Sequence, residues 1–153
     1  MDSLKNAPLL TLTLAVDFPA TTVIGDTPTG SRRIAPVTGG TFVGERLRGT
    51  VEPGADWAII RPDGVLVIDV RLTLRTDDGV AIFLRYAGRF SASPEAMARF
   101  RKGILLDAFE YSLVITASLE CGDERYRWLN DVIAVGTGRQ TVSGPVYSLF
   151  EIG

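Results

Sequence analysis

Asp69 and Arg71, within residues 65–74, are the pair of residues most able to do chemistry. One face of this stretch is apolar throughout, whereas the other changes midway from Val to Asp69, Arg71 and Thr73. If the apolar face points outward, a helix or a partner subunit must cover it. Asp69 and Arg71 then lie inside a polar barrel lumen of the kind that holds one small ligand. The alternative is an ordinary Asp and Arg on the solvent side of a sheet.

A second group of polar and aromatic side chains lies in residues 120–130. We expect a hairpin in which Tyr126, Trp128 and Asn130 share one strand face. Trp offers a flat apolar wall with one donor, and Asn offers a donor and an acceptor, so these residues suit a small polar organic ligand. Glu120, at the start of the group, is a candidate catalytic carboxylate. The alternative is that Trp128 fills the core and Asn130 bonds a backbone group at a turn.

A third group is Asp56 and Trp57, which follow a tight turn directly. Both are candidate binding residues; the alternative is that Asp56 caps the loop and Trp57 is core. In residues 61–64, Pro62 fixes a negative φ, so a type I turn closed by Gly64 in a left-handed bulge fits best. That register places Asp69 beside Trp57.

The turn at residues 77–79 decides which residue faces Arg71. An Asp-Gly type I′ turn places Arg71 opposite Tyr86, whereas a bulged turn places it opposite Arg85, a like-charge pair. We therefore favour the type I′ turn and count Tyr86 among the candidate binding residues.

Composition excludes several kinds of chemistry. The chain of 153 residues has no histidine and one cysteine, Cys121. This excludes Ser–His and Cys–His nucleophilic systems, His-ligated metals and an internal disulfide. Acidic neighbours disfavour the thiolate of Cys121, so it is not a candidate nucleophile. We expect neither a metal nor another cofactor.

Charge and hydropathy restrict the partners and the location. With 16 basic and 18 acidic residues, the net charge is -2, so no nucleic-acid partner is expected. We expect the arginine pairs, such as Arg32–Arg33, to lie on solvated faces. No apolar run is long enough to cross a bilayer, and residues 8–18 alternate like a strand rather than a signal peptide, so no membrane partner is expected. With one unpaired cysteine, the predicted location is the cytoplasm.

Alternating apolar residues between Gly, Pro and Asp clusters predict an all-β fold. We expect a single-domain antiparallel β-barrel of about eight to nine strands over residues 1–153. Residues 25–30 are predicted to be a loop, and Gly39–Gly40 a turn. One short helix is expected after the N-cap Ser93, ending at Gly103. The predicted strands are 8–18, 32–38, 41–51, 56–61, 64–75, 80–90, 111–121, 125–137 and 141–151.

The ordered series of motifs resembles the domain of unknown function 3237 family (DUF3237, UPF0311). The motifs are residues 32–34, 38–42, 47–49, 53–57 and 61–64, Asp69 with Arg71, and residues 76–79 and 126–130. The resemblance runs from about Leu9 to the C-terminus and implies a mainly antiparallel β-barrel, usually oligomeric, whose general biochemical role is not established.

Residue by residue, the resemblance emphasises a set drawn from at least four strands. Two departures matter: the turn before Ala55 has one Gly where two are common, and residues 119–121 read Leu-Glu-Cys where Phe-Glu-Thr is usual. The family residues carried over are Gly39, Gly40, Asp56, Trp57, Asp69, Arg71, Glu120, Trp128 and Asn130.

Three functions remain open. The first is a metal-independent lyase, isomerase or cyclase in which Asp69 or Glu120 transfers protons and Arg71 anchors the substrate. The second is a ligand-binding or carrier barrel without turnover, and the third is an oligomeric scaffold with a satisfied polar network. The expected partners are a small acidic or aromatic ligand and a second copy of the chain, in a homodimer or higher homo-oligomer. The homo-oligomer is argued from the apolar residues 65–74.

Overall fold

Strict alternation of side chains along the strands explains the architecture. In the computed structural model, which describes residues 2–153, one face of β6 (Leu66–Thr76) and β7 (Ala81–Ala92) is buried and the other is exposed or partly exposed. β8 (Tyr111–Glu120) shows the same alternation. Since successive side chains of a strand point to opposite faces, each strand has one face for an interior and one for solvent.

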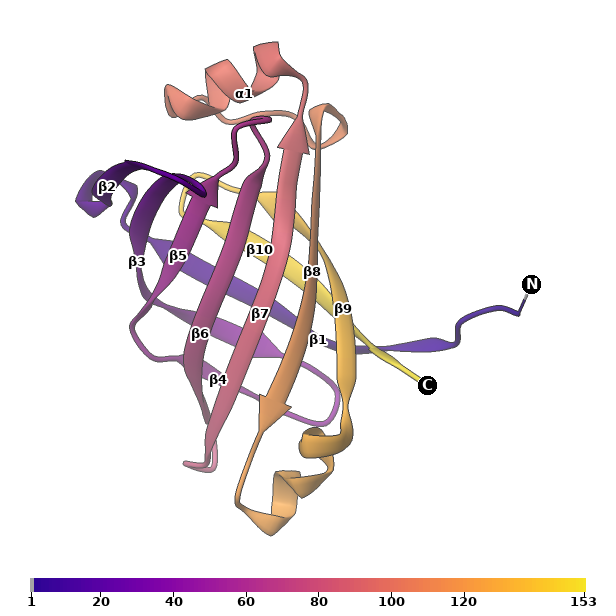
Figure 1. Ribbon diagram of the computed structural model, residues 1–153. Coiled ribbons are helices and arrows are strands. Elements are labelled where there is room, and N and C mark those ends of the chain that lie inside the picture. The colour runs from indigo at the N-terminus through magenta and orange to yellow at the C-terminus, as the bar shows by residue number, and fades with distance from the viewer. Residues whose placement is uncertain (1) are drawn as a thin grey trace.

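The other strands are β1 (Asn6–Val16), β2 (Thr22–Thr27), β3 (Gly30–Val43), β4 (Arg48–Val51), β5 (Gly54–Ile60), β9 (Ile133–Gln140) and β10 (Pro145–Ile152). Eight of the strands close into an antiparallel ring, in the order β1-β10-β9-β8-β7-β6-β4-β3, and pairing of β1 with β3 completes it (Figure 1). β5 pairs with β3 and β6 next to β4, and β2 extends β3 on its free side. This confirms the predicted antiparallel β-barrel.

The predicted boundaries around β2 and β3 are wrong. β2 occupies the first half of the stretch expected to be a loop and β3 starts at its last residue, Gly30, and β3 is continuous through the expected turn at Gly39–Gly40. The reason is barrel closure: a Cβ on Gly40 would lie 2.1 Å from the carbonyl oxygen of Thr13. The glycine therefore allows β1 and β3 to approach closely, which a local reading of the sequence does not reveal.

The predicted strand 125–137 begins only at Ile133. Before it, η3 (Glu124–Asp131) forms two short 3₁₀ segments around Tyr126, capped by the side chain of Asp123. Figure 1 shows these segments at the lower end of the barrel.

The predicted helix is present as α1 (Pro94–Arg101), at the other end of the barrel (Figure 1). Ser93 Oγ accepts a hydrogen bond from the Ala96 N–H at 3.2 Å, as expected of an N-cap. Met97 is buried, and the ring of Phe100 stacks on Phe90 with centroids 4.5 Å apart. Two further 3₁₀ turns are η1 (Phe18–Ala20) and η2 (Ala108–Glu110).

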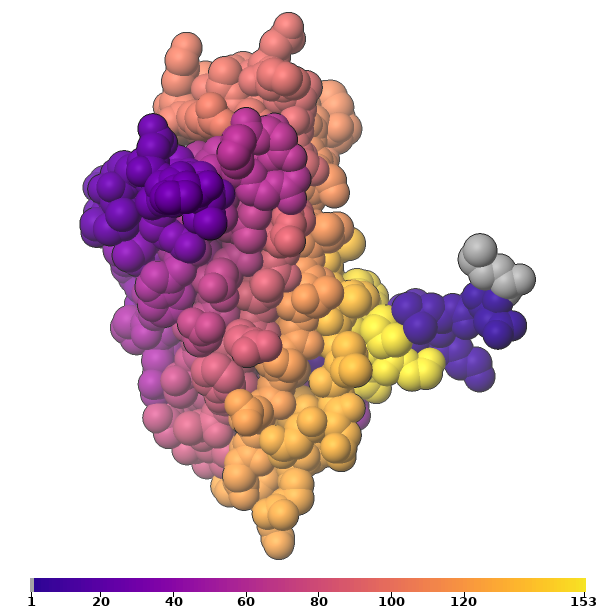
Figure 2. All heavy atoms as spheres, in the orientation of Figure 1, coloured from indigo at the N-terminus to yellow at the C-terminus, as the bar shows by residue number. Residues whose placement is uncertain are grey.

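The two ends of the chain pair with each other, from Asn6 with Ile152 onward, and project together from the side of the barrel (Figure 2). None of the helices in residues 2–153 is long and apolar enough to cross a membrane.

Candidate functional site

The structure corrects the predicted place of Asp69 and Arg71. The buried side of β6 carries Ile68, Val70 and Leu72, so the apolar face fills the barrel, while Arg71 is exposed and Asp69 partly exposed on the outer face. An eight-stranded barrel needs side chains to fill its interior, and the aliphatic face supplies them. The expected polar lumen around Asp69 and Arg71 is therefore wrong, and so is the argument that a partner must cover residues 65–74.

The turn between β6 and β7 also differs from the favoured one. Arg71 lies opposite Arg85, not Tyr86. The Thr76 N–H donates to the Val80 carbonyl at 2.9 Å, and Gly79 has a φ of 86°, which gives the bulged turn. Both arginine side chains are exposed, so water screens their repulsion.

Trp128 and Asn130 belong to the lower end of the barrel, apart from Asp69. The Asn130 side chain accepts from the Cys121 N–H at 3.1 Å and donates to the carbonyls of Cys121 and Arg127 at 2.8 and 2.9 Å. Trp128 packs against the core, and the guanidinium of Arg46 lies 3.9 Å from its ring centroid. The alternative interpretation therefore holds for this pair: Asn130 bonds backbone groups at a turn, and Trp128 packs on the core.

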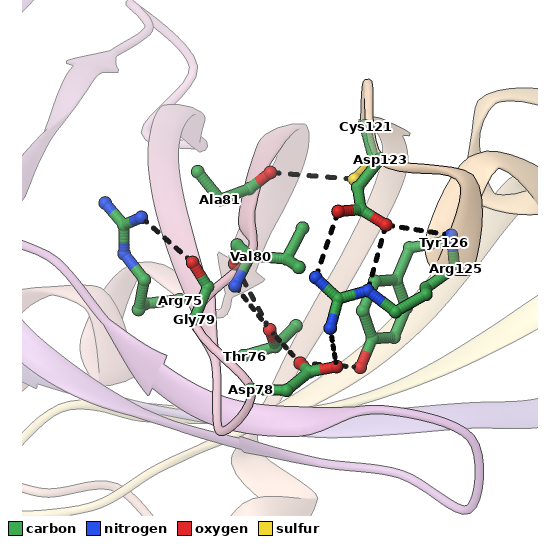
Figure 3. Close-up of polar contacts among 10 residues, drawn as sticks. All are labelled: Arg75, Thr76, Asp78, Gly79, Val80, Ala81, Cys121, Asp123, Arg125 and Tyr126. Atoms are coloured by element: carbon green, nitrogen blue, oxygen red, sulfur yellow. Dashed lines mark hydrogen bonds and ion pairs between the residues drawn. The ribbon is translucent and has the colours of Figure 1, made fainter.

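The same end carries a polar network between η3 and the β6–β7 turn (Figure 3). Asp78 accepts from the hydroxyl of Tyr126 at 2.9 Å and pairs with Arg125 at 2.8 Å; Arg125 also pairs with Asp123. The hydrogen bond from Thr76, followed by those of Tyr126 and the charge of Arg125, lowers the pKa of Asp78. These groups satisfy one another and join two segments of the chain.

Glu120 lies nearby on the outer wall. It is exposed and lines a pocket of about 480 Å³ together with Thr73, Phe83 and Asn130. The amide of Asn130 is already bonded, so this pocket presents few free polar groups beyond Glu120.

The third predicted group lies at an interruption in the pairing of β5 with β6. Asp56 pairs with Val70 and Ile59 with Val67, which places Trp57 opposite Asp69 as predicted, but the ladder between these two is not formed. The Asp69 N–H instead donates to Asp56 Oδ1 at 3.1 Å.

Arg32 provides a hydrogen-bond donor for the Trp57 carbonyl, which the interrupted ladder leaves without its backbone partner. Its Nη1 donates to the freed carbonyl of Trp57 at 2.6 Å. A carboxylate and a guanidinium thus replace backbone partners at one point in the barrel wall, and Asp56, Trp57 and Asp69 are brought together by β5 and β6.

Asp56 is also near two buried tyrosines. It lies opposite Val70, which faces the interior and itself pairs with Tyr86. The rings of Tyr86 and Tyr147 are 5.2 Å apart, and both side chains are 2% exposed. Tyr86 therefore lies on the same inner face as Asp56, with Val70 of β6 between them, and without the predicted contact with Arg71.

Burial raises the pKa of Asp56 to about 7. The hydrogen bond from Asp69 opposes the shift, the charge of Asp69 adds to it, and the charge of Arg32 opposes it. Burial also raises the pKa of Tyr86 and Tyr147, and the charge of Asp56 contributes to both shifts. At neutral pH the carboxyl of Asp56 is thus near the midpoint of its titration, and the phenols of both tyrosines are neutral.

At the upper end of the barrel, a pocket of about 460 Å³ is lined by three arginines, Arg33, Arg61 and Arg101. Arg33 lies opposite buried Ala58 and shares its face of β3 with buried Val37, so it is on the inner face. The prediction that both members of the pair at 32–33 lie on a solvated face is wrong for Arg33.

The sequence reading missed Arg32, Arg33 and Tyr147. A usable signal existed for the arginines, because two consecutive residues of a strand point to opposite faces and one must face inward. The sequence also gives a signal for Tyr147: it is two residues from Leu149 on β10, so both side chains point to the same buried face. No group of three or more His, Cys, Asp or Glu within residues 2–153 is placed to hold a metal ion.

Fold and site define a small closed β-barrel with a buried carboxyl–tyrosine cluster and an arginine-lined end. The chain belongs to the family described as protein of unknown function (DUF3237), whose sequence profile matches residues 5–152. A UPF0311 protein of Rhodopseudomonas palustris is 29% identical over 132 residues, 86% of each chain. A UPF0311 protein of Clostridium acetobutylicum is 30% identical over 129 residues, 83% of this chain and 80% of the other.

Solved structures agree with the fold. The crystal structure of a conserved protein of unknown function from R. palustris superposes with a TM-score of 0.94 at 27% identity, covering 100% of both chains. A β-barrel-like protein from Acinetobacter baumannii gives 0.85 at 32% identity, over 100% of this chain and 98% of the other. An enzyme from Penicillium herquei gives 0.75 at 19% identity over 100% and 97%, a likeness in fold alone.

Proposed function

We propose that this protein is a small-molecule-binding barrel that catalyses a metal-independent proton transfer, in a lyase, isomerase or cyclase reaction, with Asp56 as the proton-transfer group. The observation that supports this most directly is the pKa of Asp56, which burial raises to about 7. A carboxyl with that pKa is present in both protonation states near neutral pH, which is what a general acid–base catalyst requires. Asp56 replaces Asp69 and Glu120 in this role, because those two lie on the outer wall.

Tyr86 and Tyr147 supply the second part of the chemistry. Both hydroxyls are protonated at neutral pH, since burial raises a pKa that is already well above 7, so they can donate hydrogen bonds to an oxygen that gains negative charge. In the isomerase form of the proposed step, the carboxylate of Asp56 takes a proton from a C–H next to a carbonyl group of the substrate, and the electron pair of that bond moves onto the carbonyl oxygen as an oxyanion. Asp56 then returns the proton to another atom of the same molecule. No oxidant, reductant or metal is consumed.

The experiment is a two-stage screen. Thermal shift against a library of small carboxylic and phenolic acids first identifies ligands, and NMR in D₂O then follows deuterium incorporation into each ligand. We expect exchange with the native protein and its loss in Asp56→Asn, which keeps the shape and the acceptor for the Asp69 N–H but cannot take a proton. Asp131→Asn, an exposed acid on η3, is the matched control and should exchange normally.

A carrier without turnover is the second candidate. The carrier is favoured because Asp56 does not line the upper pocket, so a molecule bound there is separated from the proposed base. Ligand binding without deuterium exchange would support the carrier and contradict the enzyme. Equal exchange in the native protein and in Asp56→Asn would contradict Asp56 as the base.

A further inference from the structure

The upper pocket has an unusual balance of charge. β2, the β5–β6 turn and α1 meet at this end of the barrel (Figure 2), and each contributes to the lining together with β3 and β5. Arg33 comes from β3, Arg61 from the β5–β6 turn, and Arg101 from the end of α1, while Asp26 of β2 is the one acidic lining residue. The lining therefore carries three positive charges and one negative charge in a protein whose net charge is -2.

The three arginines differ in how far the protein satisfies them. Arg61 is paired with Asp63, which lies in the same turn and does not line the pocket. Arg101 is exposed and lies over the turn: a Cβ on Gly64 would be 3.9 Å from its Nη2. Arg33 is partly buried, and its Nε is buried without a hydrogen-bond partner among residues 2–153.

An unpaired buried N–H of a guanidinium is costly, because it has lost water and gained no acceptor. A ligand oxygen that accepts from Arg33 removes that cost at the moment of binding. Planar carboxylate and tetrahedral phosphate both match the fork of a guanidinium, and a second arginine within the same pocket supplies further donors. The size of the pocket, about 460 Å³, is that of a small-molecule site.

We propose that this pocket binds the oxyanion of a small molecule, a carboxylate or a phosphate, with Arg33 as its central ligand and Arg101 as a second donor. Asp26 also lines the pocket, and its carboxylate can accept a hydrogen bond from a hydroxyl or amine next to the anionic group. The inference goes beyond the proposed function, because Asp56 is not among the residues that line this pocket. Binding itself needs no turnover, so the two can fail separately.

The test is calorimetric titration of the native protein, in a buffer without carboxylate or phosphate and at low salt. The probes are inorganic phosphate in one arm and benzoate in the other. We expect saturable binding of at least one probe, and the arm that binds more tightly identifies the anion. Arg33→Gln, which keeps much of the side chain and removes the charge, should weaken binding about tenfold or more, the effect of losing a charge-assisted contact.

Two further variants keep the inference testable. Arg85→Gln changes the net charge by the same amount, but Arg85 is exposed on the outer face of β7. The affinity of this variant for the probe should therefore match that of the native protein. Arg101→Gln should also weaken binding, and since Arg101 is exposed, its removal leaves folding intact even if Arg33→Gln does not fold.

Three outcomes would overturn the inference. They are the absence of saturable binding for both probes at millimolar concentration, native affinity in Arg33→Gln and Arg101→Gln, or an equal loss in Arg85→Gln. Loss of deuterium exchange in Asp56→Asn is measured on a different ligand atom and in a different assay. Anion binding without exchange would therefore leave this inference standing and contradict the proposed enzyme alone.

Discussion

The carboxylate of Asp56 accepts a hydrogen bond from the backbone N–H of Asp69 at 3.1 Å, where the carbonyl of the facing strand would be the acceptor in a regular ladder. That carbonyl, of Trp57, is bound by Arg32 instead. One partly buried acid thus completes the wall of the barrel and also faces the same interior as the buried tyrosines. The protonation of Asp56 therefore affects both the stability of the barrel and the proposed proton transfer.

Asp56 predicts how stability depends on pH. Its pKa is about 7 in the folded protein against 3.8 for the unfolded chain, so between these values the folded state holds a proton that the unfolded state has lost. The stabilisation from protonated Asp56 is complete below pH 3.8 and is lost as the pH rises to about 7. Its slope is about 1.4 kcal/mol per pH unit.

Asp56→Asn removes this dependence, and urea unfolding of both proteins at several pH values measures it. We expect the variant to gain stability relative to the native protein as the pH rises from 5 to 7. Acids with lowered pKa, such as Asp63 and Asp123, act in the opposite direction but are common to both proteins. Parallel stability curves would show that Asp56 titrates normally.

Gly40→Ala should strongly destabilise the barrel. The new methyl group would lie 2.1 Å from the carbonyl oxygen of Thr13 and 3.1 Å from Cα of Leu14, so β1 must move away from β3. We expect a loss of about 3 kcal/mol in the free energy of unfolding, at the upper end for overpacking because the obstacle is backbone. Gly122→Ala has no atom within 4 Å of its new methyl group and serves as the control in chemical denaturation. Similar midpoints for both variants would disprove the closure argument.

Asn130→Ala tests the clip at the lower end of the barrel. Removing the amide leaves the N–H and the carbonyl of Cys121 without their partner, which should cost about 1–3 kcal/mol in unfolding experiments. Titration of phosphate or benzoate should be unaffected, because the arginine-lined pocket lies at the other end. Arg127→Ala, which changes an exposed neighbour and keeps its carbonyl, should remain as stable as the native protein. A variant at Asn130 that loses ligand affinity without losing stability would restore Asn130 as a binding residue.

A homo-oligomer is still expected from the family resemblance, although the apolar residues 65–74 no longer argue for it. Light scattering at micromolar concentration should report a mass of two or more chains. The mass of one chain, 16.5 kDa, across the concentration range would refute the expectation.

Local sequence signals predicted what local interactions determine. Ser93 and Pro94 predict the start of α1, and Pro62 with Gly64 predict the turn in which the Gly64 N–H donates to the Arg61 carbonyl at 2.9 Å. Alternation along the strands, together with the motifs of the family, predicts the antiparallel barrel. The helix start and the turn each depend on residues within a few positions of one another, so both can be predicted from the local sequence. The barrel was predicted because alternation occurs in strand after strand and the family motifs run along most of the chain.

Only the tertiary structure decided which face of each strand points inward. Residues 65–74 alternate equally well with Asp69 and Arg71 inside or outside, and the choice depends on the aliphatic side chains that seven other strands bring to the same interior. Likewise, Arg33 faces a pocket because β2, β5 and α1 surround it, and Asp56 enters the ladder because β6 leaves an N–H free opposite it. Burial, and with it the pKa of Asp56, is a sum over neighbours distant in the chain, which is why closure of the barrel determines the site and local pattern does not.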